Sequence, residues 1–508
     1  MPNILPGAPA PDIDAFRALA GPGRVVPVFV EFPFDTETAV TAYAKLRRGS
    51  FGFLLESVIG GERWARYSFL GSGPREAWKV RDGVVSRWTP DGSWAQVGRA
   101  EDALSEFGRW LGRWEPADVK GLPRFWGGAV GFFGYDIVRW FERLPDAPAR
   151  DIDCPDACFL LTDCVLIIDN LFNRAHAVTA VPISADEDVD VDALYAEAVE
   201  RLRGWLADLR EPCRLEPLRS GPAALDGISP RSNRTRQDYE GAVERIREYI
   251  RAGDAFQVVL SQRLEVPMEA DSLAVYRALR SLNPSPYLYL LELDSVRLIG
   301  ASPEVLVRVE EGEVTVRPIA GTRPRGSGEE EDRALADELL ADGKERAEHL
   351  MLVDLGRNDV GRVAEAGSVR LAEFMTIERY SHVMHMVSEV TGRLRDGCDA
   401  LDAFRACFPA GTLTGAPKIR AMEIIDELEP TRRGPYGGAA GYIGWGARSL
   451  DMAIAIRTIV NAGERAYIQA GAGIVHDSVP EREWQETRDK ARALVGALAR
   501  ALPTGGGT

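Results

Sequence analysis

The sequence has few residues that build metal–thiolate sites and no long apolar run. Six cysteines and five histidines occur in 508 residues. Cys154, Cys158 and Cys164 form the only cysteine cluster, but no Cys-x-x-Cys pair or close histidine accompanies them, which disfavours a zinc site. No apolar run approaches the roughly 20 residues of a membrane-spanning helix, and the N-terminus has no signal-peptide pattern. We therefore expect a cytoplasmic protein with reduced thiols.

Positive charge is also in short supply. Lysine and arginine total 61 against 77 aspartates and glutamates, which gives a formal net charge of -16. This balance argues against nucleic acid and against an anionic membrane surface as partners. An anionic substrate would have to meet local positive charge or a bound cation. The 45% apolar and 27% charged content is typical of a soluble globular protein.

The periodicity of apolar residues divides the sequence into two β-rich halves. Helical spacing is clear over 189–210 and 236–251, whereas 211–232 loses periodicity and gains Pro, Gly and Ser. We therefore predict an N-terminal unit at 24–210, a linker at 211–232 and a second unit at 233–503. Hairpin-joined strands argue against a doubly wound parallel sheet. The expected fold class is α+β, with antiparallel β-sheets in a sandwich-like core and helices on the outside.

The stretch 467–490 is predicted to form a strand, a glycine loop and a helix. Gly471 and Gly473 would leave backbone N–H groups open to a ligand, because no Cβ blocks the approach. The helix would begin near Pro480. Its charged residues at i, i+3 and i+7 share one face, and they are Glu483, Glu486 and Lys490.

A second acidic pair has the same spacing on another predicted helix. Glu345 and Glu348 stand at i and i+3 within 344–355. Carboxylate oxygens without Cys or His partners suit Mg²⁺ better than Zn²⁺. The alternative is that the two acidic helix faces are unrelated and simply solvated.

An arginine and a threonine are further candidates for binding an anion. Arg457 lies in the predicted strand 451–460 on the face with the small residues, and its planar fork suits a carboxylate. A structural ion pair explains it equally well. Thr412 lies in GTLTGAPK, ahead of a helix that Pro417 starts, and helix starts attract anions. Plain capping is the alternative there.

Two residues are candidates for proton transfer. Glu304, in GASPEVLV, precedes a strand, where shielding would raise its pKa and suit a general acid. His385 alternates with Val383 and Val387 on a predicted strand. A satisfied core histidine and a catalytic histidine are both consistent with that pattern.

Taken together, these segments resemble the chorismate-binding enzyme family, and most closely its anthranilate synthase component I branch. The resemblance implies conversion of chorismate and ammonia to anthranilate and pyruvate in tryptophan biosynthesis. Nine matching segments follow the family order between residues 51 and 490, and they are LLESV, NPSPY, GASPE, RPIAGTRPRG, ERAEHLMLVDLGRNDVGRV, RYSHVMHMVSEV, FPAGTLTGAPKIRAM, YGGAAGY and IQAGAGIVHDSVPEREWQET.

The resemblance implies a role for each candidate residue. Glu348 and Glu486 would bind Mg²⁺, which would hold the ring carboxylate of chorismate. Glu304 would protonate the departing C4 hydroxyl, and His385 would assist in the elimination. The residues that would hold or line the substrate are Gly321, Thr322, Thr412, Tyr436, Arg457, Gly471, Ala472, Gly473 and Lys490.

Two positions distinguish branches of the family. Isochorismate and salicylate synthases are similar but carry a lysine base where this chain has Gln257, so ammonia is the expected nucleophile here. Aminodeoxychorismate synthases have a motif similar to PIKGT where this chain reads PIAGT. The Ala320 that stands in place of the lysine cannot act as a nucleophile. Aminodeoxychorismate synthase component I remains the close alternative. We predict that Gln257 and Thr412 belong to the catalytic residues together with Glu304 and His385.

Two ligands or partners besides the substrates follow from the resemblance. The sequence shows no amidotransferase domain, and Cys407 precedes Pro409 at a helix end, so the ammonia would be free NH₃ or would come from a separate glutaminase subunit. The resemblance implies a separate glutamine amidotransferase subunit, and therefore a hetero-oligomer. The N-terminal unit would be regulatory and bind tryptophan as a feedback inhibitor. An interdomain packing seam is the alternative reading, and a non-catalytic tryptophan-binding regulator is disfavoured because the catalytic candidates are retained. The tryptophan-binding residues would be Ser57, Pro286, Tyr287 and Leu288.

Overall fold

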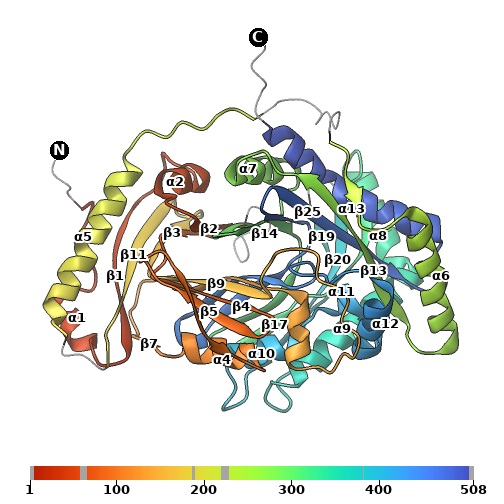
Figure 1. Ribbon diagram of the computed structural model, residues 1–508, viewed down its shortest axis with the longest axis horizontal. Coiled ribbons are helices and arrows are strands. Elements are labelled where there is room, and N and C mark those ends of the chain that lie inside the picture. Colours follow the sequence, from red (N-terminus) through yellow and green to blue (C-terminus); the bar gives the residue numbers. More distant parts are fainter. Residues whose placement is uncertain (1–4, 58–65, 186–188, 219–227, 381–382, 503–508) are drawn as a thin grey trace, which may run out of the picture.

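A computed structural model shows two large β-sheets packed face to face, with helices on their outer surfaces (Figure 1). Among the described residues, no helix is long and apolar enough to cross a membrane. The predicted fold class is confirmed. The structure describes residues 5–57, 66–185, 189–218, 228–380 and 383–502.

The first sheet is antiparallel throughout its described residues, except where β7 runs parallel to β1 at one edge. β21 (Gly415–Ala416) pairs with β13 beside the main path. The order across this sheet is β12 (Arg231–Ser232), β13 (Gln257–Pro267), β25 (Arg465–Ile474), β24 (Thr458–Ala462), β15 (Val296–Ser302), β14 (Tyr287–Leu293), β2 (Phe51–Glu56), β3 (Tyr67–Ser72), β10 (Cys164–Asp169), β11 (Arg174–Pro182), β1 (Arg24–Pro33) and β7 (Glu115–Pro116).

The second sheet is also antiparallel, and β19 (Arg370–Arg379) pairs with β20 beside its main path. The order across this sheet is β18 (Ile319–Pro324), β20 (Val383–Arg393), β17 (Glu313–Val316), β16 (Val305–Glu310), β23 (Leu450–Ile454), β22 (Ala439–Gly444), β8 (Gly128–Phe133), β9 (Ala157–Thr162), β4 (Glu76–Arg81), β5 (Val84–Trp88) and β6 (Trp94–Arg99).

Alternating side chains of these strands build separate apolar layers. On β2, Phe53 joins the cluster between the sheets, whereas its neighbour Leu54 packs under the helices of the first sheet. The ring centroids of Phe69 from the first sheet and Tyr442 from the second lie 5.5 Å apart. Full burial of one such side chain contributes about 1.5–3 kcal/mol. The sandwich therefore has an inner layer and two outer layers.

The helices cover the outer faces of both sheets. Figure 1 shows α2, α5, α7 and α13 over the first sheet and α4, α9, α10 and α12 beneath the second. Their bounds are α1 (Ile13–Leu19), α2 (Ala39–Leu46), α4 (Ala103–Leu111), η1 (Tyr135–Trp140), α5 (Val191–Leu209), α6 (Arg236–Ala252), α7 (Ser272–Leu282), α8 (Glu329–Ala341), α9 (Gly343–Gly361), α10 (Ala400–Cys407), α11 (Gly411–Thr414), α12 (Lys418–Leu428), η2 (Trp445–Ala447) and α13 (Pro480–Ala501).

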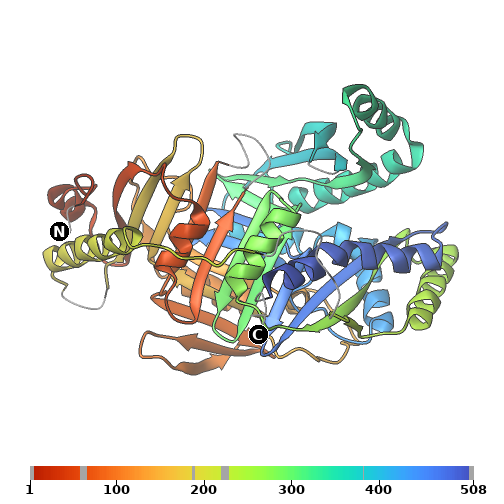
Figure 2. The ribbon, with the colours of Figure 1, turned by 90° about the horizontal axis from the view of Figure 1, so that it is seen from above.

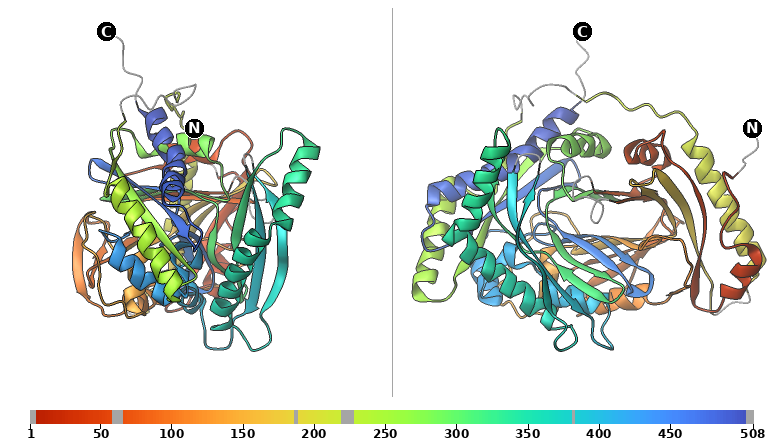
Figure 3. Two further views of the ribbon diagram at one scale, coloured as in Figure 1. Left: turned by 90° about the vertical axis from the view of Figure 1, so that its right-hand side faces the viewer. Right: turned by 180° about the vertical axis from the view of Figure 1, so that it is seen from behind.

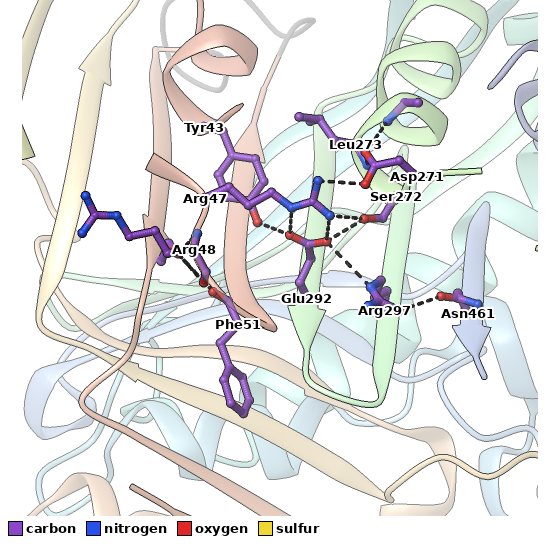
Figure 4. A network of polar contacts seen from close by, with 12 residues as sticks. Tyr43, Arg47, Arg48, Phe51, Asp271, Ser272, Leu273, Glu292, Arg297 and Asn461 are labelled. Carbon is purple, nitrogen blue, oxygen red and sulfur yellow. Dashed lines mark hydrogen bonds and ion pairs between the residues drawn. The ribbon is translucent and has the colours of Figure 1, made fainter. Parts of the chain in front are cut away.

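Both sheets continue across the predicted boundary at 211–232. β2 pairs with β14 in the first sheet, and β8 pairs with β22 in the second. A buried polar network reinforces the first junction, as Figure 4 shows. Glu292 of β14 accepts hydrogen bonds from the Tyr43 hydroxyl and from Arg47 Nη2, each at 2.6 Å. The boundary thus divides the sequence but not the sheets, and the division into a regulatory and a catalytic unit stays a prediction.

Two sequence predictions about the C-terminal strands were wrong. The stretch 451–460 was expected to be one strand, but it forms the end of β23 in the second sheet and the start of β24 in the first. Arg457 lies in the break between them. Gly471 and Gly473 were expected in a loop, but both lie inside β25, paired with β13.

Candidate active site

A cavity of about 810 Å³ lies where β13 and β25 meet α9, α11, α13, β18 and β20. In Figure 2 the teal segment of α8 and α9 stands to one side of the blue helix α13, and Figure 3 shows the same segments from the end and from behind. This volume is in the range of small-molecule sites. The predicted site residues that line the cavity are Gln257, Pro286, Glu304, Gly321, Thr322, Glu348, His385, Thr412, Tyr436, Arg457, Gly471, Gly473, Glu486 and Lys490.

Two acidic pairs line this cavity from different helices. The i, i+3 spacing puts Glu345 and Glu348 on one face of α9, and Glu483 and Glu486 on one face of α13. Burial raises the pKa of Glu348, and the charges of Glu345 and Glu486 raise it further. Burial also raises the pKa of Glu483, to which the charge of Glu486 contributes. Glu348 and Glu483 therefore each lie close to other negative charge, which a bound cation would offset.

Lys490 partly neutralises this acidic group. Its Nζ donates to Oε1 of Glu486 at 2.7 Å and to the backbone oxygen of Gly471 at 2.9 Å, which ties α13 to β25. Across the described residues, no three His, Cys, Asp or Glu side chains are grouped so that they could hold a metal. A cation shared by Glu348 and Glu486 would thus have two protein ligands and would compete with Lys490 for one of them. Mg²⁺ commonly binds through one or two carboxylates, with water and substrate oxygens completing its shell.

Glu304 is a buried carboxyl group on the wall of the cavity. It follows the end of β15, lines the cavity and is only 8% exposed. Burial raises the pKa of Glu304 to about 8, although the Thr412 hydroxyl donates to its Oε1 at 3.2 Å and opposes that rise. Glu304 is therefore largely protonated at neutral pH, and Thr412 fixes its orientation. This is the state that a general acid needs.

His385 lines the cavity from β20 and is held by the neighbouring strand β18. Its Nδ1 lies 3.0 Å from the backbone oxygen of Gly321 and 3.1 Å from Oγ1 of Thr322. Because a carbonyl oxygen only accepts, Nδ1 carries the proton and Nε2 keeps a free lone pair in the neutral ring. Burial lowers the pKa of His385, so the ring is neutral at pH 7. The geometry therefore leaves His385 able to accept a proton at Nε2.

Arg457 and Tyr436 form a different wall of the cavity. Arg457 has a backbone φ of +49°, which is uncommon for a residue with a side chain and concentrates at functional sites. Burial lowers its pKa, which marks a guanidinium with little compensating charge close by. The buried Tyr436 ring lies 5.5 Å from the guanidinium carbon of Arg433. Arg457 can thus meet an anion without first breaking a strong ion pair.

The glycines of β25 make room for their neighbours. A Cβ on Gly471 would lie 2.7 Å from the Tyr436 hydroxyl, and a Cβ on Gly473 would lie 2.3 Å from Nε2 of Gln257. A side chain at Gly471 would therefore clash with Tyr436, and one at Gly473 would displace the Gln257 amide. Ala472 points the other way, into the apolar cluster under α6 and α12, so only its backbone remains available to a ligand.

Comparison with known proteins decides which family this geometry belongs to. The family model described as chorismate binding enzyme matches residues 66–496. The chain belongs to the chorismate-binding enzyme family. It is 51% identical to anthranilate synthase component 1 of Pseudomonas putida over 499 residues, covering 97% of this chain and 99% of the relative. It is 47% identical to the Aquifex aeolicus protein of the same name over 489 residues, covering 96% and 97%.

Two solved structures share the fold of this chain over most of their length. Anthranilate synthase component I from Streptococcus pneumoniae is 38% identical, with a TM-score of 0.75, covering 91% of this chain and 99% of that one. The menaquinone-specific isochorismate synthase from Escherichia coli is 18% identical, with a TM-score of 0.69, covering 96% and 98%. At that identity the second structure shows only that the fold is shared.

The residues predicted to bind tryptophan lie around the junction of β2 and β14. Leu288 pairs with Glu56, the neighbour of Ser57, and the Ser57 hydroxyl is buried with no partner in the described chain. The Tyr287 hydroxyl donates to Asp451 at 2.9 Å. Of the four residues, Pro286 alone also lines the 810 Å³ cavity. The turn at 283–286, which precedes β14, therefore lies between this junction and the candidate active site.

Several residues of the cavity wall were missed by the reasoning from sequence. Lys344 and Arg482 each directly precede a member of an acidic pair, and this position in the sequence could have identified them as site residues. Tyr380 packs edge-on against His385 with ring centroids 5.6 Å apart, a contact between separate segments that no local pattern indicates. Among the missed residues are Asn283, Ser285, Lys344, Tyr380, Gln469 and Arg482.

Proposed function

We propose that this protein converts chorismate and ammonia to anthranilate, pyruvate and water, as the name of its close relatives implies. The observation that carries the proposal is Glu304, a buried carboxyl group with a pKa of about 8 on the wall of the cavity. Loss of the C4 hydroxyl of chorismate needs a proton, because hydroxide is a poor leaving group. A carboxyl group that keeps its proton at neutral pH supplies it.

Binding of the dianionic substrate is the second requirement. We assign the enolpyruvyl carboxylate to Arg457, Tyr436 and the backbone N–H groups near Gly471 and Gly473, because the Arg457 guanidinium lacks close compensating charge. The ring carboxylate would then face α9 and α13. A carboxylate could not approach the acidic pairs there without a cation between them.

Magnesium fits the residues at that position. Glu348 and Glu486 offer only carboxylate oxygens, and burial and mutual repulsion hold the pKa of Glu348 above its ordinary value. When bound, the ion would neutralise these carboxylates and withdraw charge from the ring carboxylate. Lys490 would give up Glu486 and keep its bond to the oxygen of Gly471.

Proton transfers are assigned to two residues. Glu304 gives its proton to the C4 oxygen, which leaves as water, and the Thr412 hydroxyl stabilises the carboxylate that remains. His385, neutral and oriented through Nδ1, takes the C2 proton at Nε2 as the enolpyruvyl group leaves as pyruvate. These two groups act at successive steps.

Aminodeoxychorismate synthase is the second candidate function. Ala320 lines the cavity where the relatives with that activity resemble PIKGT, and its methyl group cannot attack the substrate. This residue favours anthranilate as the product.

Ammonia is proposed to come from a separate glutamine amidotransferase subunit, which makes the active form a hetero-oligomer. Burial raises the pKa of the Cys407 thiol well above its ordinary value, so it is a poor nucleophile for glutamine hydrolysis. Burial has the same effect on the pKa of Cys154, Cys158 and Cys164. Free thiols also suit a cytoplasmic location.

Tryptophan is proposed as a feedback inhibitor that binds at the junction of β2 and β14. The unpartnered Ser57 hydroxyl is a free hydrogen-bonding group there. Because residues 283–286 line the catalytic cavity, a ligand at the junction could shift their position.

One assay tests the proposed function. The purified protein is given chorismate, Mg²⁺ and ammonium, and anthranilate fluorescence and pyruvate are measured together. We expect the two products in equal amounts and a lower rate when tryptophan is added. Aminodeoxychorismate without pyruvate would establish the second candidate instead. Tight tryptophan binding with unchanged chorismate would indicate a non-catalytic regulator.

A further inference from the structure

Gln257 lines the candidate active site, and its side-chain oxygen is a buried hydrogen-bond acceptor without a partner among the described residues. It begins β13, lines the cavity and is 7% exposed. Its Nε2 donates to Oε1 of Glu348 at 3.5 Å. Its Oε1 is buried and has no hydrogen-bond partner in the described chain. Buried acceptors are nearly always satisfied, so this oxygen points to a missing donor.

The orientation of the Gln257 amide is set by its surroundings. Turning the amide over would put its carbonyl oxygen against the Glu348 carboxylate, where two acceptors repel each other. On the side of β25, Gly473 leaves room for the amide, since a Cβ there would lie 2.3 Å from Nε2. Nε2 is therefore held toward Glu348, and Oε1 is the atom left for a ligand.

We propose that Oε1 of Gln257 accepts an N–H bond of ammonia and directs the nitrogen lone pair at C2 of chorismate. This inference rests on the proposed function and assigns the position of its second substrate. Ammonia combines N–H donors with a lone pair, and a neutral amide accepts one donor without removing a proton. Water could donate to the same oxygen, but an amide is too weak a base to activate it.

The step balances with the groups already assigned. The lone pair of ammonia forms the C2–N bond, the two ring π bonds each shift by one position, and the C4–O bond breaks. The departing oxygen takes the proton of Glu304 and leaves as water. The new ammonium group loses one proton, which restores the Glu304 carboxyl in the overall balance.

A substitution of Gln257 separates ammonia use from chorismate binding. Gln257→Met keeps the length of the side chain and removes the acceptor. We expect the KM for free ammonia to rise about tenfold or more at saturating chorismate and Mg²⁺, with the Kd for chorismate unchanged within about twofold. Should this variant fail to fold, Gln257→Asn withdraws the acceptor by one methylene and gives the same direction.

Gln262 on the same strand provides a matched control. It is 2% exposed, its Oε1 accepts from Ser232 and its Nε2 donates to Thr487, so both polar atoms of its amide have a partner. Gln262→Met should lower stability and leave the KM for ammonia unchanged.

The outcomes separate this inference from the proposed function. An unchanged KM for ammonia in Gln257→Met would overturn the inference. An equal loss of affinity for ammonia, chorismate and Mg²⁺ would also overturn it, because that pattern means that Gln257 only supports Glu348. A wild-type protein that forms no anthranilate would refute the proposed function itself.

Discussion

Replacement of Glu304 by glutamine should remove activity and at the same time make the protein more resistant to alkaline pH. Glutamine has the same shape and can still accept the hydrogen bond from Thr412. It has no acidic proton to give to the C4 oxygen. Loss of a general acid lowers kcat by about 10²- to 10⁴-fold. The fold and the binding of chorismate should remain.

The stability effect follows from the pKa of Glu304. Burial raises that pKa from 4.5 to about 8, so the native protein keeps a proton that the unfolded chain releases. The Glu304 carboxyl group makes its full contribution to the stability of the folded protein below pH 4.5, and this contribution is lost as the pH rises to about 8. Between pH 5.5 and 8.5 the wild type should lose about 3 kcal/mol through this group, at 1.36 kcal/mol per pKa unit. Glu304→Gln should not show that loss.

Urea unfolding at pH 5.5 and at pH 8.5 measures the difference between the two proteins. Activity is measured in parallel at constant free ammonia, and in the wild type kcat should decline above pH 8 as Glu304 loses its proton. A Glu304→Gln variant with normal kcat would refute the assignment of the acid. An identical fall in stability for variant and wild type would refute the raised pKa.

Three further predictions test other parts of the site. Glu348→Gln should reduce turnover to background with an unchanged circular dichroism spectrum and weaker Mn²⁺ binding, and normal activity would exclude this residue as a metal ligand. Arg457→Lys keeps the charge but loses the planar fork, so the KM for chorismate should rise about 10- to 100-fold, whereas an equal KM would show that the guanidinium does not contact substrate. Ser57→Phe removes the hydroxyl and adds a bulky ring at the β2–β14 junction, so it should abolish inhibition by tryptophan with kcat retained, and full inhibition of this variant would place the tryptophan site elsewhere.

Local signals in the sequence were enough to predict most elements of the fold. The helix predicted at 236–251 is α6, and it ends at Gly253, whose φ is +87°. The helix predicted to contain 344–355 is α9. These features depend on apolar spacing and on residues with special backbone freedom, both of which are readable locally.

The break at Arg457 could not be predicted in the same way. Apolar alternation continues through DMAIAIRTIV, so nothing local marks the point where the chain leaves one sheet for the other. The two strand halves are distinguished only by their partners, since β23 pairs with β22 and β24 pairs with β25. Tertiary pairing thus decides the geometry of the residue assigned to the substrate carboxylate.

The convergence of the acidic pairs was predicted from spacing and resemblance, but its details were not. Helical spacing placed Glu348 and Glu486 on faces of α9 and α13, and both line one cavity. The bond from Lys490 to the backbone oxygen of Gly471, and the unpartnered oxygen of Gln257, depend on how α13 packs against β25 and β13. Side-chain pairs between distant segments leave no periodic trace in the sequence.

Location of a bound cation tests the central claim most directly. Crystals of the protein soaked with Mn²⁺, which can replace Mg²⁺ and scatters anomalously, would show where the ion sits. We predict a single strong anomalous peak in the cavity, within about 2.5 Å of carboxylate oxygens from both Glu348 and Glu486. A peak that contacts only one of these residues, or lies outside the cavity while Glu486 stays bound to Lys490, would contradict the account.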